Sequence, residues 1–318
     1  MKRVYVTGGN GFLGHSVVKG LAKAWDEVDY VVSADLRDPA PEHEIEGVIY
    51  LKADVTDAQV ISDQILDNEI DTVVHLASIV NPGKSTTTEQ EYAVDVTGSK
   101  NVLEACVRHG VKRIVVSSSG AAYGYHADNP AWLKETDPVR GTETFPYSLH
   151  KRLVEEMLAE YKETDPYLEQ VVLRIGTILG ESVDNQITDL FKSKRLIKIR
   201  GSDSPFVFIW DQDVVAIMVQ AVLGDKTGIF NVAGDGSMTV DEIANELGKG
   251  TLPIPVGVLK AGLSVGQKLG RTPHGPDQTD FLQYRPVLDN AKLKSEFGYT
   301  PQYTTREAFK AWQVANGL

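Results

Sequence analysis

Short apolar runs alternate with amphipathic stretches along the first 120 residues of the chain. The runs are rich in valine and isoleucine, and they occupy residues 3–7, 30–34, 48–51, 72–76 and 113–117. Because their apolar residues do not alternate with polar ones, they are typical of parallel strands covered by helices on both faces. Helical spacing fills the intervals at residues 12–25, 59–66 and 89–109. The pattern predicts an α/β fold with a doubly wound parallel sheet.

The alternation continues, less regularly, in the second half of the chain. Further strands are predicted at residues 170–174, 206–210 and 229–232, with helices at 145–162 and 214–223. We expect the last two strands to rejoin the sheet. Residues 252–286 are rich in glycine and proline and have no clean period, so they are assigned to a smaller C-terminal region.

No internal repeat and no obvious linker divides the chain into consecutive units. We therefore predict two interleaved domains. The first comprises residues 1–178 with 205–233 and carries the parallel sheet. The second is smaller, comprises residues 179–204 with 234–318, and is the expected substrate-binding domain.

A glycine-rich turn lies between the first predicted strand and the first predicted helix. Its sequence, Thr7-Gly-Gly-Asn-Gly-Phe-Leu-Gly14, places glycines at positions 8, 11 and 14. Gly8 permits a tight turn, Gly11 lets the backbone approach a pyrophosphate, and Gly14 lets the helix pack closely against the strand. The N–H groups at the helix start then hold the anion. The turn predicts a dinucleotide-binding Rossmann domain, although a glycine triplet alone also fits a tight turn without a ligand.

Two carboxylates extend this prediction to the identity of the dinucleotide. Asp35 ends the second predicted strand, 21 residues after Gly14, where a carboxylate can accept hydrogen bonds from both ribose hydroxyls of an adenosine. Asp54 follows the third strand and is placed to meet the adenine amino group. Because Asp35 would repel a 2′-phosphate, the predicted cofactor is NAD rather than NADP. Arg37, two residues further on, is a nearby group that favours NADP instead.

The composition excludes several classes of protein. The chain is 42% hydrophobic, and its 32 basic and 44 acidic residues give a net charge of −12. This balance disfavours nucleic acid and anionic membranes as partners. Cys106 is the single cysteine and the seven histidines lack a metal-ligand spacing, so we expect neither an internal disulfide nor a bound metal. With no signal peptide or long apolar run, the protein is expected to be soluble and cytoplasmic.

A tyrosine, a lysine and a serine form the candidate catalytic set. Tyr147 and Lys151 have the Tyr-x-x-x-Lys spacing, which places both side chains on one face of a helix. Ser119 lies in a serine-rich segment that follows a predicted strand and ends at Gly124. With the glycine turn, these residues resemble the extended short-chain dehydrogenases/reductases of the NAD-dependent epimerase/dehydratase group. Further matching segments are His75-Leu-Ala77, Leu173-Arg-Ile-Gly176, Asp213 and Phe230-Asn-Val-Ala-Gly234.

The resemblance implies a role for each member of this set. Free tyrosine has a pKa of about 10 and is a poor base at neutral pH. An ammonium about 4 Å away stabilises a tyrosinate by roughly 4 kcal/mol at an effective dielectric of 20, so Tyr147 is the expected general base. Lys151 is also expected to bind the nicotinamide ribose, and Ser119 to hydrogen-bond the substrate oxygen. Taken alone, the spacing also fits an amphipathic helix with a half-buried tyrosine and a solvated lysine.

The resemblance also assigns the remaining contacts. The expected cofactor-binding residues are Gly8, Asn10, Gly11, Phe12, Leu13, Gly14, Asp35, Asp54, Val55, Leu76, Ala77, Ser78, Ser117, Tyr147 and Lys151. The expected substrate-binding residues are Ser119, Tyr147, Thr177 and Phe206. The resemblance further implies a homodimer formed through the helices at 89–109 and 145–162, whose apolar stripes intramolecular packing explains equally well.

The residues after Ser119 narrow the expected reaction. Dehydratases of the family that this chain resembles carry Thr-Asp-Glu here, whereas this chain has Ser119-Gly120-Ala121, with neither carboxylate. Dehydration is therefore disfavoured. We expect an NAD-dependent oxidoreductase or epimerase that acts on a secondary hydroxyl of a small, sugar-like or polar substrate. The alternatives are an NAD-dependent reductase or dehydrogenase of a non-sugar carbonyl, and a non-catalytic dinucleotide sensor.

Three positions depart from the 4-epimerase pattern. Thr177 stands where the family usually has an asparagine that contacts the sugar nucleotide, and Phe206 stands where epimerases place an arginine on the substrate diphosphate. Asp95 likewise replaces a common asparagine. Because a phenyl ring cannot neutralise a diphosphate, these departures disfavour a standard nucleotide-sugar 4-epimerase. Arg200 and Arg271 are the alternative sources of positive charge.

Overall fold

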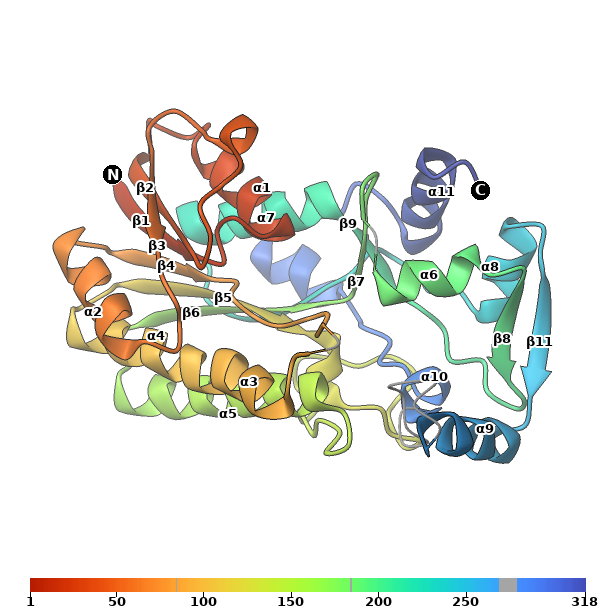
Figure 1. The fold of residues 1–318 in the computed structure, drawn as a ribbon. Coiled ribbons are helices and arrows are strands. Elements are labelled where there is room, and N and C mark those ends of the chain that lie inside the picture. The colour runs from red at the N-terminus through yellow and green to blue at the C-terminus, as the bar shows by residue number, and fades with distance from the viewer. Residues whose placement is uncertain (84, 184, 269–278) are drawn as a thin grey trace.

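A parallel seven-stranded sheet forms the centre of the larger part of the protein (Figure 1). The computed structural model describes residues 1–83, 85–183, 185–268 and 279–318. The strand order is β10-β6-β5-β4-β1-β2-β3, and all neighbouring pairs run parallel. The strands are β1 (Lys2–Thr7), β2 (Val28–Asp35), β3 (Val48–Lys52), β4 (Thr72–His75), β5 (Arg113–Ser119), β6 (Glu169–Ile175) and β10 (Gly228–Val232). The predicted doubly wound sheet is confirmed, and its order reverses between β1 and β4, where such folds bind ligands.

Helices cover both faces of this sheet, which explains why its strands are apolar without alternation. On one face α1 (Phe12–Leu21) packs with α7 (Asp211–Leu223), and on the other lie α2 (Ala58–Asp67), α4 (Gly98–Arg108) and α5 (Pro146–Thr164) (Figure 1). Within β1, Val4 and Val6 join the first core, and Tyr5 joins the second. Each face therefore has its own hydrophobic core.

The predicted helix at 89–109 is interrupted. The structure divides it into α3 (Thr88–Tyr92), a π-helical turn, η2 (Ala93–Thr97), and α4. A capping box of Thr87 with Gln90 begins the helix, and Asp95 lies inside the π turn. π turns inside α-helices occur frequently at functional sites, and Asp95 contacts the candidate site described below.

A third core, rich in aromatic residues, lies in the C-terminal part. Two short parallel pairs, β7 (Thr177–Leu179) with β9 (Phe208–Trp210) and β8 (Arg195–Ile199) with β11 (Gly250–Ile254), adjoin α6 (Gln186–Lys192), α8 (Val240–Glu246) and α11 (Thr305–Ala315). Phe191, Phe206, Phe208, Phe309 and Trp312 pack together here. The expectation that residues 206–210 rejoin the main sheet is wrong, because β9 pairs with β7, whereas β10 rejoins the sheet as predicted.

Regular elements also form where the sequence predicted none. Within residues 252–286 the structure has the end of β11, α9 (Val256–Lys268) and α10 (Thr279–Gln283). Pro255 directly precedes α9, a position that suits proline at a helix start, so there its presence does not break the helix. Shorter helical turns are η1 (Pro41–His43), η3 (Gly120–Tyr123) and the π-helical η5 (Leu293–Phe297).

No helix in the described ranges combines the length and the apolar character that crossing a membrane requires. The division into interleaved domains and the homodimer stay predictions. In solution, light scattering tests the dimer, for which the expected mass is twice that of the 34.8 kDa chain.

Candidate active site

The glycine turn after β1 has a shape that only glycine permits at two of its positions. Gly8 has a φ of +66°, and a Cβ there would lie 2.9 Å from the Ala77 nitrogen. A Cβ at Gly14 would lie 2.0 Å from the Gly8 oxygen, so α1 packs directly against the turn. The helix begins after Gly11 with no side-chain cap and no acidic residue in its first turn, where Phe12 and Leu13 lie. A helix start of this kind fits a pyrophosphate.

Asn10, at the tip of the glycine turn, holds Asp35 beside that turn. The Asn10 backbone N–H donates to Asp35 Oδ2 at 3.1 Å, and the Asn10 side chain donates to the Arg37 carbonyl at 2.7 Å. Ser33 donates to Asn10 Oδ1 at 2.9 Å. The carboxylate therefore lies at the end of β2 next to the pyrophosphate turn, where it suits ribose hydroxyls and disfavours a 2′-phosphate.

We expect NAD to bind at least tenfold more tightly than NADP, which corresponds to about 1.4 kcal/mol. Asp35→Ala should reduce this ratio because it removes the carboxylate that repels the 2′-phosphate. Asp38→Ala is the matched control, since Asp38 is exposed and pairs with Lys52 at 2.9 Å. Calorimetric titration with both nucleotides measures the ratio. Equal affinities in the unmodified protein would contradict the role of Asp35.

The remaining cofactor-binding candidates lie after β3 and β4. Asp54 is exposed at the end of β3, and the neighbouring Val55 is buried. After β4, the N–H groups of Leu76 and Ala77 donate to Thr7 Oγ1 at 3.2 and 3.3 Å. The carboxyl ends of β1 to β4 therefore bring the candidate residues for NAD to one edge of the sheet.

The catalytic candidates come from the end of β5 and the first turns of α5. Lys151 is 8% exposed, and its Nζ donates to the Ser117 carbonyl at 2.9 Å. The same Nζ lies 5.6 Å from the centre of the Tyr147 ring. Ser119 Oγ accepts from the Ala121 N–H at 3.1 Å, so the Ser119 hydroxyl can still donate. The structure thus places a buried ammonium against the tyrosine.

His75 fills the space between β4 and α4 as a neutral group. Its Nδ1 lies 2.7 Å from Thr7 Oγ1 and its Nε2 lies 2.9 Å from Ser99 Oγ. Burial, together with the charge of Lys151, lowers the pKa of His75 from 6.5 to about 3. The imidazole therefore stays uncharged at neutral pH and serves the packing of this edge.

This shift predicts acid destabilisation. Between pH 6.5 and about 3 the unfolded chain protonates His75 while the folded protein does not, so stability falls as the pH falls through this range. The slope from this residue is at most about 1.4 kcal/mol per pH unit. In urea titrations at several pH values, His75→Gln should flatten the dependence and the exposed His43→Gln should not. Parallel curves for the unmodified protein and His75→Gln would contradict the assignment.

A buried aspartate–histidine pair lies next to the candidate catalytic set. Asp95, in the π turn Ala93–Thr97, is 3% exposed and its Oδ2 lies 3.0 Å from His150 Nδ1. Asp95 Oδ1 accepts from the Ser78 hydroxyl at 2.9 Å and from the Ile79 N–H at 2.8 Å. The pair therefore joins the loop after β4 to the turn of α5 that carries Lys151.

Burial raises the pKa of Asp95, but the hydrogen bond from His150 and the charge of Lys151 outweigh burial and lower it below its usual value. The sequence analysis noted Asp95 only as a departure from a common asparagine and did not connect it to His150. The available signal was the combination of a carboxylate in the Asp95-Val-Thr-Gly98 segment with a histidine directly before the catalytic lysine.

The two remaining substrate-binding candidates lie farther along the chain. Thr177 is half-buried at the start of β7, where its N–H donates to the Val207 carbonyl at 3.3 Å. Phe206 is 3% exposed and forms an antiparallel bridge with Met238. Phe206 thus belongs to the aromatic core, and one face of its ring is covered by Arg285, which the sequence analysis did not consider.

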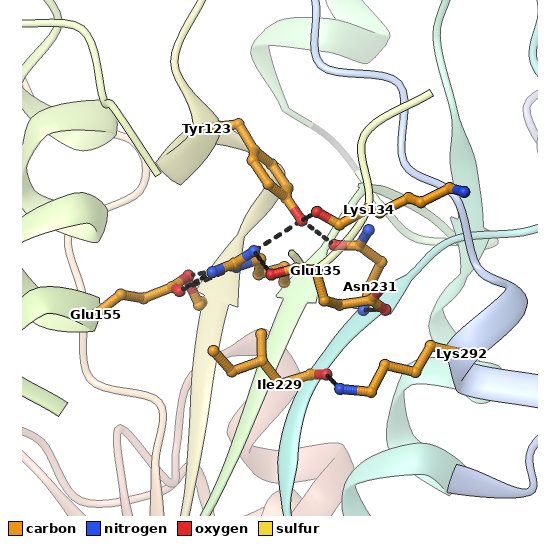
Figure 2. A network of polar contacts seen from close by, with 9 residues as sticks. Tyr123, Lys134, Glu135, Glu155, Ile229, Asn231 and Lys292 are labelled. Carbon is orange, nitrogen blue, oxygen red and sulfur yellow. Dashed lines mark hydrogen bonds and ion pairs between the residues drawn. The ribbon is translucent and has the colours of Figure 1, made fainter. Parts of the chain in front are cut away.

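A buried polar network fixes the other side of α5 (Figure 2). Glu155, one turn after Lys151, accepts from Arg174 Nη2 at 2.6 Å and also from the Ser118 hydroxyl. Arg174 Nη1 donates to the Tyr123 hydroxyl at 2.8 Å, and that hydroxyl lies 2.9 Å from Asn231 Oδ1. The network connects β5, β6, β10 and α5, and it therefore helps to fix the position of the helix that carries Tyr147 and Lys151. Within the described part of the chain, no three His, Cys, Asp or Glu side chains gather into a metal-binding cluster.

Comparison with known proteins identifies relatives along the whole chain. The profile of the NAD dependent epimerase/dehydratase family matches residues 4–233. An uncharacterized protein of Mycobacterium tuberculosis is 24% identical over 320 residues, covering all of this chain and 85% of that protein. The UDP-glucose 4-epimerase of Neisseria meningitidis serogroup C is 30% identical over 187 residues, which are 57% of this chain and 54% of the epimerase.

Solved structures share the fold. The UDP-glucose 4-epimerase of Thermotoga maritima with UDP-glucose superposes with a TM-score of 0.75 at 20% identity, covering 99% of this chain and 98% of that one. The Thermus thermophilus UDP-glucose 4-epimerase in complex with NAD gives a TM-score of 0.73 at 25% identity, with 99% of each chain covered. The Bordetella bronchiseptica enzyme WbmG with NAD and UDP gives 0.74 at 20% identity, covering 99% and 93%. The resemblance read from the motifs is thus confirmed: the chain belongs to the NAD-dependent epimerase/dehydratase family, and NAD is its cofactor.

Proposed function

We propose that the protein is an epimerase or dehydrogenase that oxidises a secondary hydroxyl of a small, sugar-like or polar substrate, with Tyr147 as base. The observation that carries this proposal is the buried Lys151 ammonium, held by the Ser117 carbonyl at 2.9 Å and lying 5.6 Å from the Tyr147 ring. A buried cation in this place stabilises a negative charge on the neighbouring tyrosine.

NAD, when bound, supplies the acceptor for the hydride. Tyr147, in the tyrosinate form that the Lys151 charge stabilises, takes the proton of the substrate hydroxyl and becomes neutral tyrosine. Ser119 donates a hydrogen bond to the substrate oxygen and holds it near the tyrosine. Lys151 also has donors left for the nicotinamide ribose, because the Ser117 carbonyl accepts only one of its three.

The residues at the sheet edge would hold the dinucleotide along its length. The start of α1 suits the pyrophosphate, Asp35 the adenosine ribose and Asp54 the adenine amino group. The segment after Ser119 supports oxidation without water loss, because Gly120 and Ala121 carry no acid or base.

The test is turnover by the purified protein with NAD on UDP-, GDP- and dTDP-sugars, sugar phosphates and neutral polyols. Chromatography detects epimers and NADH absorbance detects net oxidation. Epimer formation without net NADH indicates an epimerase, and accumulating NADH indicates a dehydrogenase. Tight NAD binding without turnover of any compound would contradict the proposal and favour a dinucleotide sensor.

A further inference from the structure

Arg285, just after α10, is held against aromatic rings in the C-terminal part. Its guanidinium carbon lies 3.8 Å from the centre of the Phe206 ring and 5.5 Å from that of Phe281. Nη1 donates to the Ser204 carbonyl at 2.8 Å and lies 3.0 Å from Ser204 Oγ. Stacking and hydrogen bonds therefore fix the plane of the guanidinium.

Among the residues that the structure describes, this guanidinium has no negative partner. Nε is buried and has no hydrogen-bond partner, and no carboxylate of the described residues pairs with Arg285. Burial lowers the pKa of Arg285 to about 9, so the side chain is still a cation at neutral pH. Two buried arginines differ, because Arg113 pairs with Glu169 and Arg174 with Glu155. A fixed, desolvated cation without a counter-charge is costly, and its free N–H groups suit a bound anion.

The backbone that receives Arg285 is strained. Ser204 is 7% exposed and has a φ of +29°, in the left-handed region that residues other than glycine rarely adopt. This conformation presents both its carbonyl and its hydroxyl to the guanidinium. Strain of this kind occurs frequently at ligand-binding positions, where the surrounding fold maintains it.

Aromatic contacts connect Arg285 to the catalytic tyrosine. The Phe281 ring, beside Arg285, lies 5.8 Å from Phe145 and 5.2 Å from Tyr125 between ring centres. The Phe145 ring in turn lies 6.5 Å from that of Tyr147. The unpaired cation is therefore separated from the reacting group by two rings, a separation that one small molecule can span.

We propose that Arg285 binds an oxyanion of the substrate, a phosphate or a carboxylate, while the secondary hydroxyl of the same molecule meets Tyr147. With Nη1 bound to Ser204 and Nε buried, Nη2 is the guanidinium nitrogen that can donate to an oxygen of such a group. Phe206 takes part as the platform that orients the arginine. We thus assign the positive charge that residue 206 lacks to Arg285, whereas Arg200 is exposed. Arg271 lies outside the described residues.

This inference rests on the proposed function, but its test is a binding measurement. Calorimetry of the full-length, NAD-loaded protein with glucose 1-phosphate, UDP, glucuronate and glucose compares Arg285→Gln and Arg285→Lys with the unmodified protein. Arg285→Gln should lose at least tenfold in affinity for one or more oxyanion probes, and Arg285→Lys should retain part of it. The probe with the largest loss distinguishes a phosphate monoester, a nucleoside diphosphate or a carboxylate. Glucose, NAD affinity and the exposed control Arg195→Gln should show no change.

A second readout separates ligand binding from a structural role. Without ligand, Arg285→Met should leave the melting temperature unchanged or raise it, because the substitution removes an uncompensated cation. A marked drop, with equal loss for glucose and the oxyanions, would show that Arg285 only supports the fold. Unchanged oxyanion affinity in Arg285→Gln, loss through Arg200→Gln instead, or no binding of any oxyanion probe would overturn the proposal. Calorimetry measures ligand binding and does not need turnover. The result for Arg285 can therefore be interpreted even if Tyr147 does not act as the base.

Discussion

Tyr147→Phe is expected to lower turnover at least about 100-fold and to leave NAD affinity unchanged. The substitution removes one oxygen from a ring that α5 and Phe145 hold in place, so the site keeps its shape and loses its base. Turnover is measured on whichever compound of the panel the unmodified protein converts, and NAD binding by calorimetry. Near-normal kcat in Tyr147→Phe would contradict the catalytic role.

Two variants on the same helix control for this result. Lys151→Met should lose turnover and also weaken NAD binding, because the ammonium both supports the tyrosine and has donors for the ribose. Tyr161→Phe changes a tyrosine more than three turns further along α5 and should affect neither. Equal losses in Tyr147→Phe and Tyr161→Phe would indicate damage to the helix instead of a lost base.

Arg174→Met is expected to destabilise the protein by about 3–5 kcal/mol. It leaves Glu155, whose side chain is 3% exposed, as a buried charge whose arginine partner is gone. Urea denaturation followed by circular dichroism measures the loss. The double variant Arg174→Met/Glu155→Met should recover most of it, because it removes both charges together.

Arg113→Met is the matched control for this prediction. Its partner Glu169 has a side chain that is 51% exposed, so water solvates the carboxylate once the arginine is gone. We therefore expect a smaller loss than in Arg174→Met. Equal losses in the two variants, or no recovery in the double variant, would show that the buried pair is not the reason for the effect.

The central sheet could be predicted from the sequence because its strands are buried on both faces and its connections are local. The glycine turn and the Tyr147–Lys151 spacing could also be recognised from the sequence, since both depend on residues close together in the chain. The strand at 206–210 was assigned to the wrong sheet because its partner, β7, is set by packing of the third core.

The features that the sequence did not predict depend on contacts between distant segments. Asp95 and His150 are 55 residues apart in the chain. They meet in the structure, where Asp95 lies in a π turn. Arg285 reaches a ring 79 positions away, and neither its missing counter-charge nor the strain at Ser204 leaves a pattern in the sequence. Sites of this kind can be recognised only from the positions of side chains in the structure.

The most direct test of the central claim is transfer of an isotopic label. The NAD-loaded protein is incubated with the converted substrate carrying deuterium on the carbon of the reacting hydroxyl, and the nucleotide is released by denaturation and analysed by mass spectrometry. The proposed mechanism predicts deuterium on the nucleotide in the unmodified protein and none in Tyr147→Phe. Loss of the deuterium to solvent during conversion would contradict hydride transfer at this site, because hydride transfer leaves the label on the nucleotide or returns it to the substrate carbon.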